Sequence, residues 1–258
     1  MTYCIGVLLQ QGLVLASDTR TNAGVDQVAI SPKMHTFEVK GSRLIVLLTS
    51  GNLAITQAVV NRLKAASEKA DLDTTHLLNV PSLFDATSLV GAELRAVYDR
   101  DGQYFKNHDI DFNASIIVAG QIKNEQPRLF HVYAAGNFIE TCIETPYFQI
   151  GETKYGKPIV DRVVKHTSDI MDVVKCVLIS FDSTIRSNVS VAAPIDLLIY
   201  RTDSFHGDCK QRITENDPYY LTVRQGWSAG LKQVFSALPS PDWCWTWALV
   251  IYLLWRLH

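Results

Sequence analysis

The 258-residue sequence has almost no excess of charge, no paired cysteine pattern and no low-complexity linker. Its 24 Lys and Arg residues nearly balance 26 Asp and Glu residues, which gives a net charge of −2. This balance offers no electrostatic attraction for nucleic acid or anionic lipid, so we expect neither a nucleic-acid nor a membrane partner. Because no repeat divides the chain and 47% of it is hydrophobic, a domain with a sizeable core is predicted.

The five cysteines are odd in number and have no paired spacing, so they do not indicate a disulfide framework. They are Cys4, Cys142, Cys176, Cys209 and Cys244. The segment Thr2–Leu9 lacks the basic start and the length of a secretory signal peptide. Both features favour free thiols in a reducing compartment, and we expect a cytoplasmic protein.

The sequence shows no convincing metal or cofactor motif. The seven histidines lack ligand spacings such as H-x-x-x-H. Residues Gly151–Lys157 follow most of a P-loop pattern, but Pro158 stands where Ser or Thr would bind Mg²⁺. We interpret this segment as a tight turn before a helix, and we expect no cofactor and no metal.

Apolar runs and helical spacings predict an antiparallel α+β fold. Strands Tyr3–Leu9 and Leu13–Ser17 flank a short turn, which indicates a hairpin at the start of the chain. Strands and helices then come in blocks rather than in βαβ alternation. Further strands are expected at Arg43–Ser50, Ser115–Val118, Leu129–Tyr133, Tyr147–Ile150 and Ile195–Tyr200; helices after Gly51, after Ser82, near Pro158–Lys165, at Asp169–Ser180 and from Pro218; and surface loops at Lys64–Pro81 and Thr202–Asn216.

The second residue is the first candidate for chemistry. Removal of Met1 would leave Thr2 with a free α-amino group, and methionine is usually trimmed before a small residue. An N-terminal threonine carries its own base, because its hydroxyl attacks and its amine accepts the proton. The reference pKa of an α-amine is about 7.7–8.0, so much of it is neutral near pH 7. Many unrelated proteins also begin Met-Thr, so the pair needs support from other residues.

Three later residues supply what such a nucleophile needs. Asp18 follows the second predicted strand and Lys33 precedes the next, where the hairpin can return both to the chain start. An ammonium near Thr2 favours the deprotonated forms of its hydroxyl and amine. A carboxylate can hold that ammonium through a charge-assisted hydrogen bond. Gly51 lies where a strand runs into a helix, so its N–H can face a developing oxyanion. Taken singly, Asp18 could be a turn residue and Lys33 a solvated lysine.

These motifs, in this order, resemble the active-site motifs of proteasome β-subunits and the HslV peptidase. The closest resemblance is to the anbu branch of bacterial proteasome homologues, and it runs from Thr2 to about Trp243. The segments that carry it are SDTRTNAGVD (17–26), KMHTFE (33–38), LLTSGNLA (47–54), YFQIGETKYGKP (147–158) and DSTIRSN (182–188).

The resemblance implies an Ntn-hydrolase αββα four-layer sandwich over residues 2–243. It also implies a threonine-type endopeptidase that acts on peptides or proteins in a self-assembled ring or open helical homo-oligomer, with any unfoldase partner unknown. Thr2 would be the nucleophile, Lys33 its electrostatic activator, Asp18 the residue that orients the lysine, and Gly51 the oxyanion donor.

The resemblance also gives three auxiliary candidates, Arg20, Ser187 and Ser190. The sequence departs from the family's pattern in this region. Many proteasomal chains carry a Gly-Ser-Gly turn that helps hydrate the threonine amine, and here Glu152 replaces its serine. The family's later aspartate–serine pair has no clean counterpart, and Ser187 and Ser190 are the nearest residues. Two further functions therefore stay open: an Ntn amidohydrolase acting on a small amide, and a weakly active or structural ring subunit.

Residues 244–258 are predicted to be an apolar C-terminal extension. The run WCWTWALVIYLLW (243–255) carries no charge and contains four tryptophans. It is shorter than the ~20 residues that span a bilayer. It fits an oligomer contact, an interfacial membrane contact or a non-native end, and the resemblance stops where it begins.

Overall fold

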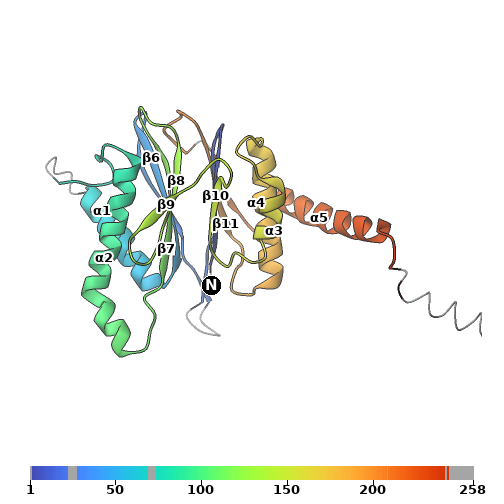
Figure 1. Ribbon diagram of the computed structural model, residues 1–258, viewed down its shortest axis with the longest axis horizontal. Helices are drawn as coiled ribbons and strands as arrows, with labels where there is room; N and C mark the ends of the chain where they lie inside the picture. Colours follow the sequence, from blue (N-terminus) through green and yellow to red (C-terminus); the bar gives the residue numbers. More distant parts are fainter. Residues whose placement is uncertain (1, 23–27, 69–73, 208, 242, 244–258) are drawn as a thin grey trace, which may run out of the picture.

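Two antiparallel sheets lie face to face between two layers of helices (Figure 1). The structure is a computed structural model, and it describes residues 2–22, 28–68, 74–207, 209–241 and 243. Within these ranges, blocks of strands alternate with pairs of helices, and a final helix closes the order. The predicted α+β class and αββα four-layer sandwich are confirmed.

The first sheet contains the start of the chain. Its strand order is β10-β1-β2-β11-β12, and every neighbouring pair is antiparallel. The predicted hairpin joins β1 (Tyr3–Leu9) to β2 (Gly12–Asp18). The remaining strands are β10 (Tyr147–Gly151), β11 (Ile195–Arg201) and β12 (Cys209–Ile213).

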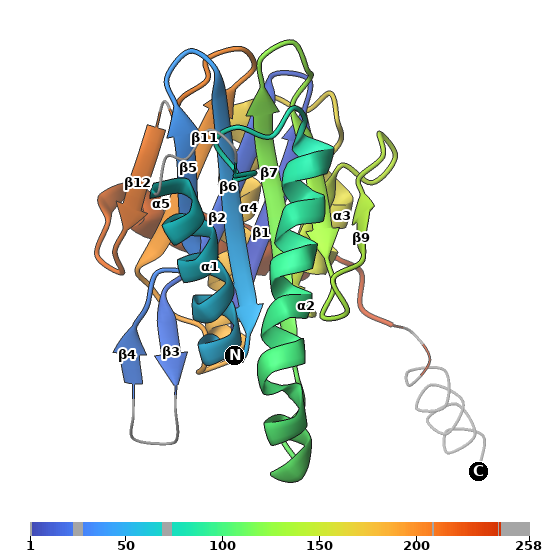
Figure 2. The same cartoon turned by 90° about the vertical axis from the view of Figure 1, so that its left-hand side faces the viewer.

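The second sheet has the order β5-β6-β7-β8-β9. Its strands are β5 (Met34–Val39), β6 (Arg43–Gly51), β7 (Ala114–Ile122), β8 (Arg128–Val132) and β9 (Phe138–Glu140). A separate ribbon of β3 (Arg20–Asn22) and β4 (Val28–Ile30) extends from the end of the molecule where the chain begins (Figure 2).

Helices cover the outer face of each sheet. The helices on the second sheet are α1 (Leu53–Glu68) and α2 (Leu83–Asn107), and those on the first are α3 (Lys157–Val163) and α4 (Ile170–Ser187). The hydroxyl of Ser82 accepts the N–H of Asp85 and so caps α2, which begins directly after Ser82 as the sequence predicts. The last helix, α5 (Pro218–Ala237), runs outward from the four layers (Figure 1).

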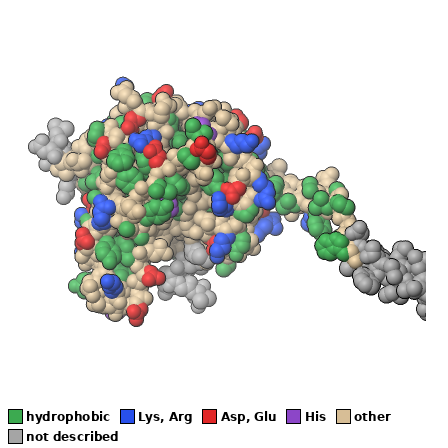
Figure 3. Space-filling model, in the orientation of Figure 1, with side chains coloured by type: hydrophobic (Ala, Val, Ile, Leu, Met, Phe, Trp, Pro, Cys, Tyr) green, Lys and Arg blue, Asp and Glu red, His purple; other side chains and the backbone are tan. Residues whose placement is uncertain are grey.

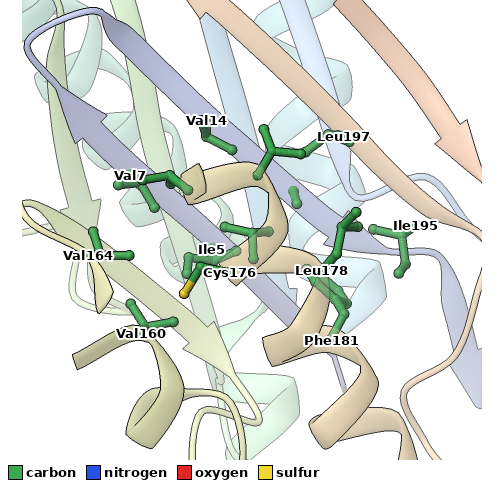
Figure 4. Packing of buried hydrophobic residues seen from close by; sticks show 14 of the residues in the cluster. Ile5, Val7, Val14, Val160, Val164, Cys176, Leu178, Phe181, Ile195 and Leu197 are labelled. Carbon is green, nitrogen blue, oxygen red and sulfur yellow. The ribbon is translucent and has the colours of Figure 1, made fainter. Parts of the chain in front are cut away.

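The central strands of both sheets read as continuous apolar runs because both of their faces are buried. In β2, Leu15 packs between the sheets, while its neighbours Val14 and Ala16 face the helices. In β6, Val46 lies between the sheets and Leu47 faces α1 and α2. Figure 4 shows the outer core of the first sheet, where side chains of α3 and α4 pack on β1, β2 and β11.

Several sequence-based boundaries are wrong. The predicted loop Thr202–Asn216 contains the edge strand β12, whose side chains are mostly exposed and therefore carry little apolar signal. The first residues of the predicted loop Lys64–Pro81 belong instead to α1, which continues to Glu68. Helix α4 also runs to Ser187, past the predicted end at Ser180.

No described helix is long and apolar enough to cross a bilayer. The predicted apolar extension 244–258 lies outside the described residues, so its three readings stay open. The last described position, Trp243, is exposed.

Four cysteines in the described part of the chain, Cys4, Cys142, Cys176 and Cys209, are free thiols.

His35 on β5 should make stability sensitive to acid. Burial, with the ammonium groups of Lys64 and Lys210, lowers the pKa of His35 to about 4. The unfolded chain, with a histidine pKa of about 6.5, then binds more protons, so stability falls as pH drops from about 6.5 to about 4. We expect His35→Gln to lose less stability than the parent between pH 7 and pH 5 in urea unfolding. The exposed His108→Gln is the control; equal losses in the parent and His35→Gln would contradict this assignment.

Candidate active site

A pocket of about 620 Å³ opens where the chain begins. Thr2 immediately precedes β1, Lys33 precedes β5, and Gly51 ends β6. These segments are separated in sequence and meet because β1 and β6 lie in sheets packed face to face. The pocket is lined by Thr2, Arg20, Thr21, Lys33, Thr49, Ser50, Gly51, Asn52, Leu53, Thr56, Asn113 and Gly151.

Asp18 and Lys33 form a buried ion pair at this pocket. Lys33 Nζ lies 2.8 Å from each carboxylate oxygen of Asp18, and Asp18 and Lys33 are 0% and 4% exposed. The N–H of Tyr3 donates to Asp18 Oδ1 at 2.9 Å, and Lys33 Nζ donates to the carbonyl of Arg20 at 2.6 Å. Burial raises the pKa of Asp18, and the Lys33 ammonium and the Tyr3 amide oppose that rise. The carboxylate thus fixes the lysine next to residue 2.

Gly51 has a backbone that only glycine adopts without strain. Its φ is +107°, and a Cβ there would lie 2.4 Å from the carbonyl oxygen of Asn113. Directly after it, Asn52 accepts the N–H of Ala54 through Oδ1 at 2.9 Å and so caps the start of α1. Gly51 therefore lies at the predicted junction of strand and helix, beside the helix's positive end.

The residue opposite Thr2 is Glu152. The backbone N–H of Glu152 donates to the carbonyl of Thr2 at 2.6 Å, next to the register pair Tyr3–Gly151. Glu152 is 5% exposed, and Asn188 Nδ2 donates to its Oε2 at 2.9 Å. Glu152 is the residue that departs from the family's Gly-Ser-Gly turn. Its hydrogen bond with Asn188 was not predicted from the sequence.

The auxiliary candidates occupy different places. Arg20 lines the pocket, supplies the carbonyl that binds Lys33, and donates through Nη1 to the carbonyl of Val189 at 2.8 Å. Ser187 ends α4 and Ser190 lies in the following loop, and neither lines the pocket around Thr2. Asn188, between them, reaches Glu152. The roles of both serines stay predictions.

Near the pocket, Ser115 and His131 also form a polar pair. Ser115 Oγ lies 2.6 Å from His131 Nε2, and burial lowers the pKa of His131. Within the part of the chain that the structure describes, no hydrogen bond from a third side chain orients this pair as a catalytic set would require. Among the described residues, no three His, Cys, Asp or Glu side chains gather closely enough to hold a metal ion.

An αββα sandwich that presents residue 2 in a pocket beside a buried lysine–carboxylate pair has the architecture of the N-terminal nucleophile hydrolases. A profile described as "Proteasome subunit" matches residues 2–199. The chain belongs to the proteasome subunit family, within its Anbu (ancestral beta-subunit) branch.

Solved structures of Anbu proteins match over most of the chain. Anbu from Yersinia bercovieri is 46% identical, with a TM-score of 0.87, over 93% of this chain and 98% of that one. The helical assembly of the Anbu complex from Pseudomonas aeruginosa gives the same values. The Anbu (Gly-1) mutant from Hyphomicrobium sp. strain MC1 is 44% identical, with a TM-score of 0.86, over 94% and 100% of the two chains. No curated protein matches significantly.

Breaking the Asp18–Lys33 pair should cost more stability than removing both charges. Asp18→Asn leaves an uncompensated buried ammonium, and such a change costs about 3–5 kcal/mol. Combining it with Lys33→Met removes that charge, so we expect the double variant to regain part of the loss. Denaturant unfolding of the parent, both single variants and the double variant checks this. Additive losses would show that the two groups are not coupled.

Proposed function

We propose that this chain is a cytoplasmic threonine-type endopeptidase that hydrolyses peptide amide bonds with Thr2 as its nucleophile. The observation that carries the proposal is the buried Asp18–Lys33 pair, whose lysine lines the same pocket as Thr2. The free thiols of the described cysteines are consistent with a reducing compartment.

In the first half of the reaction, the Thr2 oxygen attacks the substrate carbonyl carbon. The hydroxyl proton passes to the α-amine of Thr2, which removal of Met1 has freed. Lys33 favours the deprotonated hydroxyl through its charge, and Asp18 keeps the ammonium in place. The Gly51 N–H stabilises the tetrahedral oxyanion. The carbon–nitrogen bond then breaks, the ammonium of Thr2 gives its proton to the departing amine, and an ester to Thr2 remains.

In the second half, water replaces the departed amine. The α-amine of Thr2 takes a proton from the water as its oxygen attacks the ester carbon. The ester bond breaks, the proton returns to the Thr2 oxygen, and a carboxylic acid leaves. The same chemistry would serve an amidohydrolase on a small amide, so activity on peptides of increasing length separates these two functions.

Substitutions at the proposed nucleophile and activator test the chemistry. We expect Thr2→Ala to abolish peptide hydrolysis and Lys33→Ala to reduce kcat/KM by at least about 10³-fold, because members of one catalytic unit act together. Lys157→Ala, on the exposed start of α3, is the matched control and should keep its turnover. Steady-state kinetics on a fluorogenic peptide, with circular dichroism to confirm folding, measure these effects.

Near-parent turnover in Lys33→Ala would refute the assigned catalytic set. A peptide epoxyketone gives a second measurement, because it closes a ring only with a hydroxyl and an amine on the same N-terminal residue. The mass of the N-terminal peptide should then show one added inhibitor on Thr2 and no Met1. Active protein that retains Met1 would contradict the proposed base, and an inactive chain that retains it would favour the structural ring subunit.

We also propose that the chain functions in a homo-oligomer, as a ring or an open helical assembly. Helix α5 supports this, since only Tyr220 among its residues is buried. Apolar side chains on its outer half are exposed, and Figure 3 shows them along the projecting rod. Exposed apolar surface of this kind marks an interaction site. The Pseudomonas aeruginosa relative was solved as a helical assembly.

The exposed face of α5 can be tested directly. Val234 and Phe235 are 62% and 78% exposed, so changing both to Ser should not disturb the sandwich. We expect this double variant to shift the population from large assemblies to smaller species in analytical ultracentrifugation. Ile143→Ser, at a 70% exposed site in the loop before β10, is the control. A stable monomer in the parent chain at micromolar concentration would contradict the proposed oligomer.

A further inference from the structure

Glu152 lies beside Thr2 at the start of the chain. Thr2 directly precedes β1 and Glu152 directly follows β10, and the Glu152 N–H donates to the Thr2 carbonyl at 2.6 Å. Gly151, the last residue of β10, has a φ of +84°, so the regular strand pairing ends before Glu152. The backbone hydrogen bond therefore brings Glu152 directly to the residue that carries the proposed amine.

The Glu152 carboxylate is buried with few partners. Only 5% of the residue is exposed, and Asn188 Nδ2 binds its Oε2 at 2.9 Å. Asn188 Oδ1 accepts the N–H of Ser190 at 2.9 Å, so the amide is held with its NH₂ toward the glutamate. Among the residues that the structure describes, no Lys, Arg or His forms an ion pair with Glu152. A buried carboxylate is costly unless a positive charge balances it.

We propose that Glu152 is a positioning residue that binds the α-ammonium of Thr2, with Asn188 holding the carboxylate in place. This inference rests on the proposed function, because the amine is free only after Met1 has left. When the Thr2 oxygen–hydrogen bond breaks, the proton moves to the amine and creates the charge that Glu152 stabilises. The proton then goes to the departing amine, and Glu152 itself neither gains nor loses one.

A carboxylate beside the amine has opposite effects on two parts of the reaction. It makes the amine a stronger base, so the proton transfer during attack is more favourable. It also keeps more of the amine protonated at neutral pH, so less free base is ready to react. The acid limb of the pH–rate profile should therefore lie higher with Glu152 than with a neutral residue.

Two variants should lower the pKa of the Thr2 amine by different amounts. Glu152→Gln removes the negative charge and should lower the pKa of the Thr2 amine by about 1 unit, since an opposite charge within 4–6 Å shifts a pKa by about 1–3 units. Asn188→Ala removes the amide that holds the carboxylate but keeps the negative charge, so it should lower the pKa of the amine by less. Glu140→Gln, on the exposed edge strand β9, is the control and should leave the pKa of the Thr2 amine unchanged.

The pKa of the amine can be measured without catalysis. Competitive acylation of the intact protein across a pH series, read from the mass of the N-terminal peptide, titrates the Thr2 amine in each variant. The acid limb of kcat/KM should shift in the same directions, and Glu152→Gln should have a lower maximal rate. General damage to the site would lower the rate without shifting the pKa of the amine.

The proposal is overturned if Glu152→Gln leaves the amine pKa unchanged or raises it, if Asn188→Ala lowers the amine pKa more than Glu152→Gln does, or if the N-terminal peptide retains Met1. Failure of the proposed function looks different. In that case the amine titration shifts as expected in both variants, while the parent protein hydrolyses no amide substrate.

Discussion

A lysine ammonium and an aspartate carboxylate are buried together where the two sheets meet, and the surrounding backbone is arranged to satisfy them. The first residue of β1 gives its N–H to Asp18, and the first residue of β3 gives its carbonyl to Lys33. The end of β6 contributes the Thr49 N–H, which binds the Lys33 carbonyl at 2.9 Å. A shift of any of these strands by one residue would leave a buried charge unpaired, which costs several kcal/mol.

This dependence means that the pocket exists only when the whole sandwich has formed. Thr2 and Gly151 lie at the ends of adjoining strands of one sheet, Thr2 just before β1, whereas Gly51 and Asn113 lie at the ends of adjoining strands of the other, Asn113 just before β7. The inter-sheet core, which includes Leu15 and Val46, fixes the distance between these two groups. The pocket is therefore held by packing at a distance from its lining residues, and destabilising that core would disturb the pocket as well as the fold.

The sequence predicted best those features of the fold that depend on one residue type at one position. The hairpin, the helix start after Ser82 and the position of Gly51 at a strand–helix junction followed from local patterns. The Glu152–Asn188 contact could not be predicted in this way. It depends on the register of β1 against β10 and on where α4 ends, and both are set by tertiary packing. The edge strand β12 was missed because its exposed side chains lack an apolar pattern.

The position of Thr2 also has a practical consequence for handling the protein. Because Thr2 lines the pocket and Tyr3 already belongs to β1, a polypeptide joined ahead of Thr2 must begin at the pocket itself. An affinity tag at that end would start inside this pocket, while the sandwich behind it folds normally. Such a preparation would be well folded but unable to bind any ligand of this pocket.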